Sequence, residues 1–298
     1  MLLAALLAPG AYAQELEPRA YSNLPVGMNF LLVGFAKSEG SLSTAPALQI
    51  EDADLDINTG LLAYARALNL WGNSGKVDVI LPYSHLEGSA LVSGVPRERD
   101  VSGYGDPRVR LSMNFYGAPA LTMAEYPAYK HDLVIGASVQ VAIPVGQYSS
   151  DRLINLGSNR WGIKTDVGFS KAFDKVIADF TVGATIFTDN DDFFGGQRLE
   201  QRPVYSTQVN LSYDFGENVW AALGYTYYFG GRTTVEGDTK DDELGNSRVG
   251  FTLSLPIDRN YSFKFNASKG VVTRFGTGFD VVGFLIQYRW GGGLSSGN

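Results

Sequence analysis

The sequence predicts an all-β fold, a transmembrane antiparallel up-and-down β-barrel of about 12 strands, and three patterns support this prediction. Apolar residues recur at every second position in about a dozen segments, which indicates strands with two unlike faces. The connections alternate between long and short, as in bacterial barrels with long extracellular loops and tight periplasmic turns. Aromatic residues stand near the segment ends, where rings are expected at both membrane interfaces.

The amino terminus has the pattern of a secretory signal peptide. An apolar core at residues 2–8 is followed by Ala11, Tyr12 and Ala13, an A-x-A cleavage site. Although Lys and Arg are missing before the apolar core, we expect residues 1–13 to be a signal peptide and residues 14–298 to be one barrel domain. The alternative interpretation is that the first residues are a frayed apolar amino terminus. No other run is as long as 18 apolar residues, so no transmembrane helix is expected.

The strands are predicted from alternation, which the last segment shows well. Val282, Phe284 and Ile286 are apolar at every second position, and Tyr288 and Trp290 continue the series. A tilted strand needs about 9–11 residues to cross a bilayer, and most of the segments are that long. The expected strands are residues 27–37, 53–68, 76–86, 106–116, 132–145, 159–170, 176–188, 204–215, 219–229, 247–256, 261–272 and 278–290.

The connections between these strands predict which end faces the periplasm. The short ones, expected there, are residues 69–75, 171–175, 216–218 and 257–260. The long ones, expected outside the cell, are residues 38–52, 87–105, 146–158, 189–203, 230–246 and 271–277. Residues 117–131 break the rule, because about fifteen residues stand where a tight turn is expected. They either hold a short helix or mark a miscounted strand.

Closure and the aromatic residues complete the fold prediction. Unpaired backbone groups are costly in hydrocarbon, so we expect a closed barrel rather than a sandwich, with both termini periplasmic. The rings expected at the periplasmic rim are Trp71, Phe115, Tyr116, Phe173, Phe215, Tyr261, Tyr288 and Trp290. Those expected at the other rim are Tyr83, Trp161, Phe187, Tyr205, Tyr227, Phe229 and Phe279.

Composition excludes several classes of protein. The net charge of −7 argues against nucleic-acid binding, which requires a basic surface. The chain has no cysteine, so disulfides, thiolate-metal sites and cysteine catalysis are excluded. We expect no cofactor.

Several motifs resemble one known family. They are LEPRAYSN at 16–23, PVGMNF at 25–30, GYGDPRVRL at 103–111, TDNDDFFGG at 188–196 and YYFGGRT at 227–233. Together they resemble the outer-membrane family named for the meta-pathway of phenol degradation, whose members are often labelled transporters. The resemblance covers nearly all of the mature chain and implies a setting in aromatic catabolism. It assigns no solute and no functional residue.

Polar residues on the expected inner faces are the candidates for lining a lumen. They are Arg108, Arg110, Lys164, Asp166, Asp179, Gln208, Asn210, Arg248 and Lys264. In a pore, facing charges of both signs steer polar solutes. The alternative is that these charges pair across the lumen and plug it. About eight strands enclose a filled interior and about sixteen a water channel, so twelve predict a narrow or gated pore.

Two long loops carry further candidates. Phe193 and Phe194 are candidates for a constriction, or for contact with an aromatic solute, because Gly195 and Gly196 permit an inward bend. Acidic residues gather beside them and in residues 236–243. Neither run has the spacing of a known calcium loop, so we expect solvated charged loops and no metal site.

An enzymatic function finds little support. The histidines are His85 and His131, which the strand order places at opposite ends of the barrel. Some outer-membrane phospholipases have twelve strands and a Ser-His site on the outer wall, so His85 with Ser84 or Ser89 is the one candidate. No nucleophile motif accompanies it. We therefore expect a protein that is not an enzyme.

The leading hypothesis is an outer-membrane, porin-like channel of a Gram-negative bacterium for small solutes, aromatic or hydrophobic ones among them. One alternative is a non-conducting structural or adhesion barrel that acts through its extracellular loops. A lipid-modifying enzyme is the third. The expected partners are outer-membrane lipid and lipopolysaccharide, the small-molecule solute, and the barrel-assembly machinery. That machinery reads a terminal aromatic strand, and here Trp290 is followed by eight more residues, 291–298.

Overall fold

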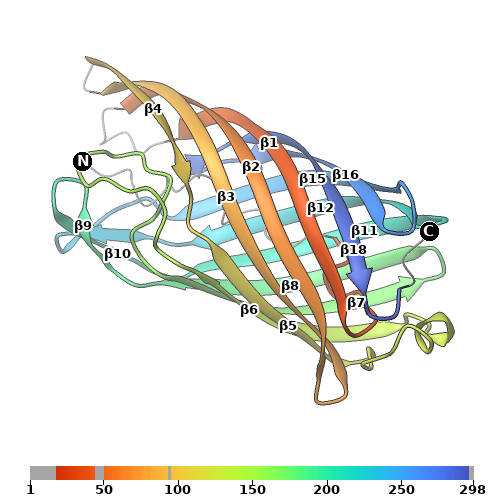
Figure 1. Ribbon diagram of the computed structural model, residues 1–298. Helices are drawn as coiled ribbons and strands as arrows, with labels where there is room; N and C mark the ends of the chain where they lie inside the picture. The colour runs from red at the N-terminus through yellow and green to blue at the C-terminus, as the bar shows by residue number, and fades with distance from the viewer. Residues whose placement is uncertain (1–17, 44–49, 93–94, 295–298) are drawn as a thin grey trace.

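Twelve antiparallel strands form the wall of a closed barrel in the computed structural model, which describes residues 18–43, 50–92 and 95–294 (Figure 1). The main sheet has 14 labelled strands. β4 and β5 lie end to end on β3 and make one wall strand, while β17 (Gly276–Thr277) extends the sheet beside the end of β1. The predicted barrel of twelve strands is confirmed; the expected signal peptide, residues 1–13, lies outside the described residues.

The wall strands run in chain order around the barrel. They are β1 (Met28–Ser43), β2 (Ile50–Leu70), β3 (Asn73–Val92), β4 (Val95–Tyr104) with β5 (Arg108–Tyr116), β6 (Leu133–Ala142), β7 (Gly162–Phe173), β8 (Val176–Phe187), β11 (Val204–Gly216), β12 (Val219–Gly230), β15 (Leu244–Pro256), β16 (Tyr261–Val272) and β18 (Asp280–Gly291).

Pairing between the first and last strands closes the barrel. Phe35 of β1 is in register with Gly60 of β2 on one side and with Phe284 of β18 on the other. β1 therefore has a partner along both edges. In hydrocarbon this matters because each unpaired backbone group costs several kcal/mol.

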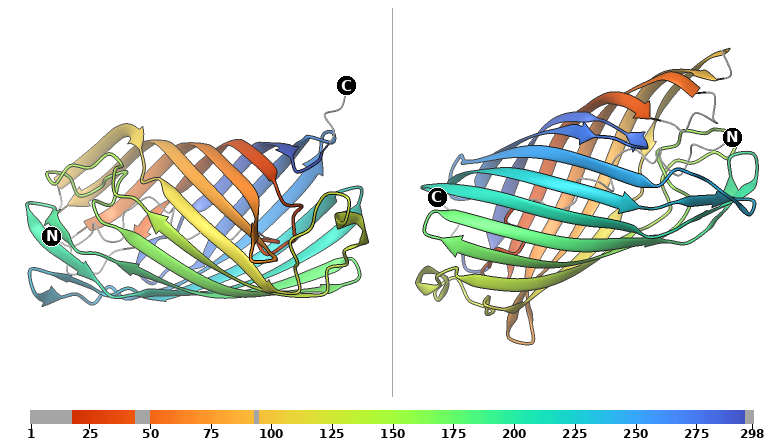
Figure 2. Two further views of the ribbon diagram at one scale, coloured as in Figure 1. Left: turned by 60° about the horizontal axis from the view of Figure 1, so that its bottom comes forward. Right: turned by 180° about the vertical axis from the view of Figure 1, so that it is seen from behind.

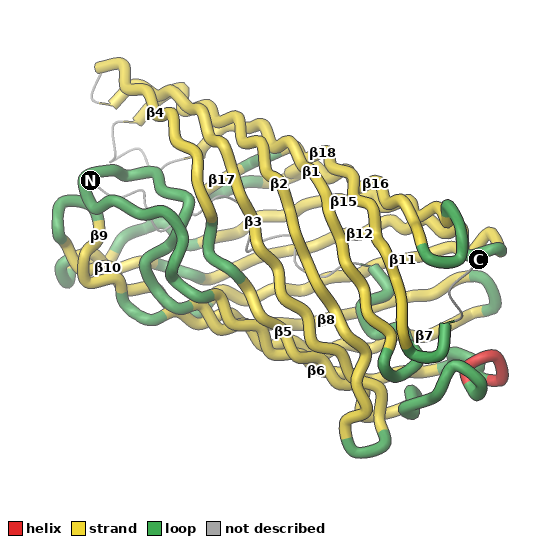
Figure 3. The backbone as a smooth tube through the Cα atoms, viewed as in Figure 1, coloured by secondary structure: helices red, strands yellow, loops and turns green. Residues whose placement is uncertain are grey.

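Short turns gather at one end of the barrel, at the right of Figure 1. Trp71 and Gly72 join β2 to β3 with φ angles of 54° and 86°, which are the positive values that a type I′ hairpin turn requires. The long connection between β5 and β6 lies at this end too, and it holds the 3₁₀ helix η2 (Tyr126–Ala128), drawn red in Figure 3. Of the two explanations for its length, the short helix is therefore the correct one.

A second, small sheet stands at the opposite end (Figures 1 and 2). It contains β9 (Asn190–Phe193), β10 (Gln197–Gln201), β13 (Thr233–Val235) and β14 (Asp238–Thr239), in the order β14-β13-β10-β9. The sequence predicted plain loops here. These strands have two to five residues each, which is too short for an alternating pattern to be recognised.

The outer surface of the wall is a broad apolar band. The large apolar side chains on it are exposed, among them Val33, Leu62, Val139, Val167, Leu223, Val282 and Phe284. A water-soluble monomer rarely exposes so large a contiguous apolar area, whereas the lipid-facing band of an outer-membrane barrel has this character. Within the described residues, no helix is long and apolar enough to cross a membrane.

Aromatic side chains border this band at both ends. Trp71, Phe173 and Phe215 are exposed at the short-turn end, and Tyr83 and Tyr104 pack edge to face at the other, with centroids 5.1 Å apart. Two residues expected among the outer rings face inward instead. Phe279 is buried in an apolar cluster inside the barrel, and the Phe187 ring lies 4.4 Å from the guanidinium of Arg160.

Candidate functional site

The inner face of the barrel has an apolar side and a polar side. Because neighbouring residues of a strand point to opposite faces, the residues between the exposed apolar ones face the lumen. On β1 to β3 these inner residues are mostly apolar, and they include Met28, Phe30, Leu55, Ile57, Ala63, Ala65, Ala67 and Leu86. On β5 to β16 they are mostly polar, and they include Asn114, Ser138, Gln140, Ser170, Thr181, Ser212 and Thr252.

The nine lumen candidates from the sequence all lie on the polar side of the inner face. Arg108, Arg110, Lys164, Asp166, Asp179, Gln208, Asn210, Arg248 and Lys264 belong to β5, β7, β8, β11, β15 and β16. Asp166, Asp179, Lys164 and Arg248 are all less than 9% exposed. Side chains so covered are enclosed by other residues of the chain at several levels of the barrel.

The contacts among these charges run mainly along the wall. Arg110 Nε donates to both carboxylate oxygens of Asp78 on neighbouring β3, at 3.1 Å each. Lys164 Nζ lies 3.4 Å from Asp166 Oδ1 on the same strand. Pairs between neighbours keep the charges at the wall. Asp78 was not among the candidates. The residues that follow it are apolar on both faces of the strand, so the alternation that identifies inner residues is not visible there.

At the short-turn end, residues 18–27 enter the lumen. The Arg19 backbone N–H donates to Asp179 Oδ2 (3.0 Å), and its guanidinium lies 3.6 Å from Asp214 and 5.4 Å from the Trp220 ring centre. Asn114 Nδ2 donates to the carbonyl oxygen of Tyr21 (3.1 Å), whose side chain is only 2% exposed. The segment is thus held by contacts from β5, β8, β11 and β12.

The long connection between β5 and β6 covers this inserted segment. Asn23 Nδ2 donates to the Pro119 carbonyl (3.0 Å), and the Tyr126 hydroxyl donates to the Asn23 carbonyl (3.1 Å). The Val26 N–H donates to the Leu121 carbonyl (2.8 Å). Together, residues 18–27 and 117–132 narrow the short-turn end. The sequence marked residues 16–30 as a motif but did not indicate that they enter the barrel.

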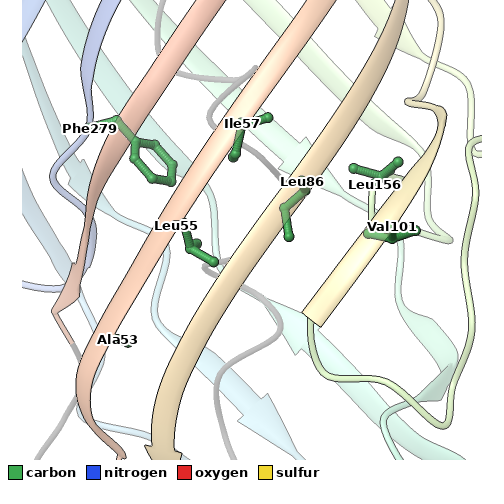
Figure 4. Close-up of a cluster of buried hydrophobic side chains, with 7 residues drawn as sticks. All are labelled: Ala53, Leu55, Ile57, Leu86, Val101, Leu156 and Phe279. Atoms are coloured by element: carbon green, nitrogen blue, oxygen red, sulfur yellow. The ribbon is translucent and has the colours of Figure 1, made fainter. Parts of the chain in front are cut away.

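The other half of the lumen holds an apolar cluster on the apolar side of the wall (Figure 4). Leu55, Ile57 and Leu86 extend from the inner faces of β2 and β3, and Val101 extends from β4. Phe279, just before β18, packs against them and is 2% exposed. The sixth large member, Leu156, comes from the connection between β6 and β7.

Asp106 holds the connection that supplies Leu156. Its Oδ1 accepts from the Gly146 N–H (2.9 Å), and its Oδ2 accepts from the Ser158 N–H (2.8 Å) and Oγ (2.6 Å). Asp106 interrupts the wall between β4 and β5, so the same residue breaks the strand and anchors the loop.

Of the two phenylalanines predicted as a loop constriction, Phe193 is the last residue of β9 in the small sheet, and Phe194 lies in the turn to β10. Phe193 is 1% exposed and packs with Leu199 and Val235, and Phe194 lies against this group. Leu153 contacts both this group and the cluster of Figure 4, so the small sheet is packed onto the loop that reaches the lumen.

Arginines bind the acidic residues of the long loops at the end opposite the short turns. Arg198 pairs with Asp189, Asp191 and Glu200, and Arg232 Nη2 lies 3.0 Å from Glu243. Asp242 accepts from the N–H of Thr233 (2.9 Å). These carboxylates therefore hold the small sheet together.

The two histidines lie far apart. On the outer wall, His85 Nδ1 is 2.7 Å from Ser102 Oγ and its Nε2 is 3.0 Å from Glu87 Oε1. Ser84 faces the lumen, where it contacts Thr59. At the short-turn end, Ser170 Oγ is 3.1 Å from His131 Nε2. Burial lowers the pKa of His131, so its ring is neutral near pH 7.

Comparison with solved structures supports this fold. The COG4313 outer membrane channel from Pseudomonas putida F1 superposes with a TM-score of 0.80 over 93% of this chain and 100% of its own, at 22% identity. The transport unit of the autotransporter AIDA-I from Escherichia coli gives 0.52 over 94% and 95%, at 9% identity. The β domain of the Bordetella autotransporter BrkA gives 0.50 over 89% and 100%, at 10% identity. At these identities the likeness concerns the fold.

Comparison with sequences places the chain in a family. No curated protein sequence matches it. The model of the family described as "Putative MetA-pathway of phenol degradation" matches residues 37–280, which is more than half of the chain and reaches from within β1 to the first residue of β18. The chain belongs to this family.

Proposed function

We propose that the protein is an outer-membrane channel for small hydrophobic solutes, aromatic ones in particular. The observation that carries the proposal is the divided inner face. Apolar wall that faces an aqueous lumen is unfavourable by about 25 cal/mol per Å². In this structure Phe279 and Leu156, which are not part of the wall, cover the apolar side chains of β2 and β3. An apolar solute that took the place of these two side chains would gain the same surface to bind.

The comparisons support this proposal in two ways. The solved relative with a TM-score of 0.80 is described as an outer membrane channel, and it matches this chain over nearly its whole length. The family description refers to phenol degradation, which makes aromatic compounds the first solutes to test. The proposed solute is one small enough for a narrow lumen.

The proposed location is the outer membrane of a Gram-negative bacterium, with the short-turn end in the periplasm. β1 begins and β18 ends at that end, in register at Met28 and Gly291. Lipopolysaccharide would then contact the outer-leaflet side of the wall, near Tyr83 and Tyr104. The barrel-assembly machinery is the proposed partner for insertion, through β18.

Uptake of a labelled solute tests the proposal. Cells that lack their general porins would express the protein, and entry of radiolabelled phenol and of a disaccharide would be measured. We expect faster entry of phenol and unchanged entry of the disaccharide. Phenol entry equal to that of empty-vector cells, with folded barrel present on a heat-modifiability gel, would refute the proposal and favour the structural or adhesion barrel.

A matched pair of variants tests the role of the divided face. Ala63→Asn places an amide on the apolar side of the lumen, and Ser112→Asn places the same group on the polar side. We expect Ala63→Asn to slow phenol entry and Ser112→Asn to leave it nearly unchanged. Equal slowing of phenol entry by the two substitutions would mean that only the size of the added side chain matters, and not the side of the lumen on which it lies.

A lipid-modifying enzyme is a second candidate, favoured by the contacts of His85. Ser102, His85 and Glu87 form a hydrogen-bonded row on the outer wall, next to the rings of Tyr83 and Tyr104. A serine, a histidine and a carboxylate in contact are the elements of a hydrolytic triad. Phospholipid hydrolysis by the refolded protein that is lost in Ser102→Ala would establish this activity. Undetectable hydrolysis would leave the row a polar contact between β3 and β4.

A further inference from the structure

Two glycines stand side by side on the inner wall, under the ring of Tyr21. Gly136 of β6 and Gly168 of β7 are in register with each other. A Cβ added at Gly136 would lie 2.8 Å from Tyr21 Cε1, and one added at Gly168 would lie 2.7 Å from the Tyr21 hydroxyl, with other ring atoms closer still. No side chain fits at either position while the ring is there. The glycine pair therefore forms a flat backbone floor for one aromatic ring.

Polar side chains border this floor. Asn114 is in register with Gly136, and Thr181 is in register with Gly168, so the four residues form a row across β5 to β8. Ser138 and Asp166 make the next row toward the extracellular end. We call the floor and its border the ring seat, formed by Asn114, Gly136, Gly168, Thr181, Ser138 and Asp166.

Tyr21 fills the shape of the ring seat but does not satisfy its polar groups. The Tyr21 hydroxyl is buried, and Thr181 lies close to it without hydrogen-bond geometry. Asp166 is 3% exposed; its Oδ2 accepts from Ser138 Oγ (3.3 Å), and its Oδ1 lies 3.4 Å from Lys164 Nζ. The Tyr21 hydroxyl is thus a buried donor without a hydrogen bond to the described residues, which is unfavourable.

The protonation of Tyr21 keeps that donor available. Burial and the charge of Asp166 raise the pKa of Tyr21, so the hydroxyl keeps its proton at physiological pH. A phenol in the same seat would meet the same surroundings and would also stay neutral.

We propose that the ring seat binds a small monocyclic phenol, and that Tyr21 is the chain's own occupant of this site while residues 18–27 narrow the lumen. A free phenol has the same ring and hydroxyl, and it can shift to donate to Asp166 because no backbone restrains it. Phenol binding therefore competes with Tyr21 and releases residues 18–27. This inference rests on the proposed function and names its solute class and its control.

The segment that carries Tyr21 is suited to such an exchange. It adds no strand to the wall, and the contacts of Arg19 with Asp179 and of Tyr21 with Asn114 fix it to the polar side. Its departure would leave the twelve-stranded hydrogen-bond ladder intact. A free phenol and the tethered ring of Tyr21 compete for one site. The observed affinity for phenol is therefore lower than the affinity of the open form, because part of the protein is closed.

Binding of labelled phenol to the refolded protein in detergent tests the inference directly. Tyr21→Ala removes the competing ring and leaves the glycine floor. Gly168→Ala removes the floor, since the new Cβ takes the place of either ring. Gly250→Ala is the matched control, because an added Cβ at this inner position meets its nearest atoms at 3.7 Å, which is ordinary contact.

We expect Tyr21→Ala to bind phenol at least about tenfold more tightly than the unchanged protein, because the closed form no longer competes. Gly168→Ala should lose specific binding, Gly250→Ala should match the unchanged protein, and cyclohexanol should not displace the label. Equal phenol affinity in Tyr21→Ala and the unchanged protein, or retained binding in Gly168→Ala, would overturn the inference. A heat-modifiability gel confirms that each variant is folded.

Ion conductance separates this inference from the proposed function. Tyr21→Ala in a planar bilayer should conduct more than Gly250→Ala, and phenol should raise the conductance of the unchanged protein. If Tyr21→Ala conducts and phenol neither binds nor changes conductance, the ring seat is refuted and the channel stands. If phenol binds as expected and every variant fails to conduct, the channel is refuted and the site stands.

Discussion

At the scale of single residues, direction on a strand decides what a side chain does. Leu81 and Leu86 belong to the same strand, β3, but face opposite ways. Leu81 is 41% exposed on the lipid side, and Leu86 is 0% exposed in the cluster of Figure 4. The same residue type therefore contacts lipid in one case and its own chain in the other.

Truncation of these two leucines should have unequal costs. Leu86→Ala leaves a cavity among Leu55, Ile57 and Val101 and should lower the free energy of unfolding by about 2–4 kcal/mol. Leu81→Ala should cost less, because lipid chains can move into the space. Urea unfolding in lipid vesicles measures both. A larger loss for Leu81→Ala would contradict the assignment of faces.

His131 should make the short-turn end sensitive to acid. Burial lowers the pKa of His131 below its ordinary value of 6.5, so the folded protein holds the neutral ring. Below about pH 6.5 a detached connection takes up a proton that the docked one does not, and docking weakens as pH falls. Above pH 7 both forms are neutral and the effect vanishes.

Limited proteolysis between pH 5 and pH 7.5 measures this effect. Cleavage within residues 117–131 should become faster as pH falls, and His131→Gln should remove most of that dependence. Corrections for the pH profile of the protease come from an unfolded reference peptide. An unchanged pH dependence in His131→Gln would show that another group is responsible.

At the scale of elements, the wall was predictable and the parts inside it were not. Alternation is a local pattern, so most of each wall strand could be located from its own residues, and the inward direction of Arg110 and Lys164 followed from their alternation with apolar neighbours. β4 was missed, because it lies within residues 87–105, which were expected to be a loop. The contact of Arg110 with Asp78 and the entry of Tyr21 into the lumen depend on residues 32 to 147 positions apart, which no local pattern records. The small sheet escaped because its strands are too short.

The connection between β6 and β7 should depend on Asp106. Asp106→Ala removes three hydrogen bonds to one carboxylate, each of about 1.5–3 kcal/mol at most, and should detach residues 146–158 without unfolding the barrel. Asp151→Ala, in the same connection and exposed, is the control. Hydrogen exchange should rise in residues 146–158 of Asp106→Ala alone. Faster exchange throughout β6 and β7 as well would mean that Asp106 supports the wall.

At the scale of the whole molecule, one closed barrel wall surrounds a lumen that is narrowed in two places. Residues 18–27 narrow the short-turn end, and Leu156 with Phe279 fills the apolar side toward the other end. Neither restriction is part of the wall. A channel that is narrowed by movable parts is consistent with a barrel of twelve strands, which lies between filled barrels of about eight and open pores of about sixteen.

The central claim is that a solute path runs through this lumen, and single-channel recording of a variant with both restrictions relieved tests it most directly. Tyr21→Ala combined with Phe279→Ala leaves every wall strand unchanged. In planar bilayers the double variant should give long-lived openings with a conductance larger than that of the unchanged protein. A folded double variant that shows no conductance would contradict the claim and leave a barrel without a channel.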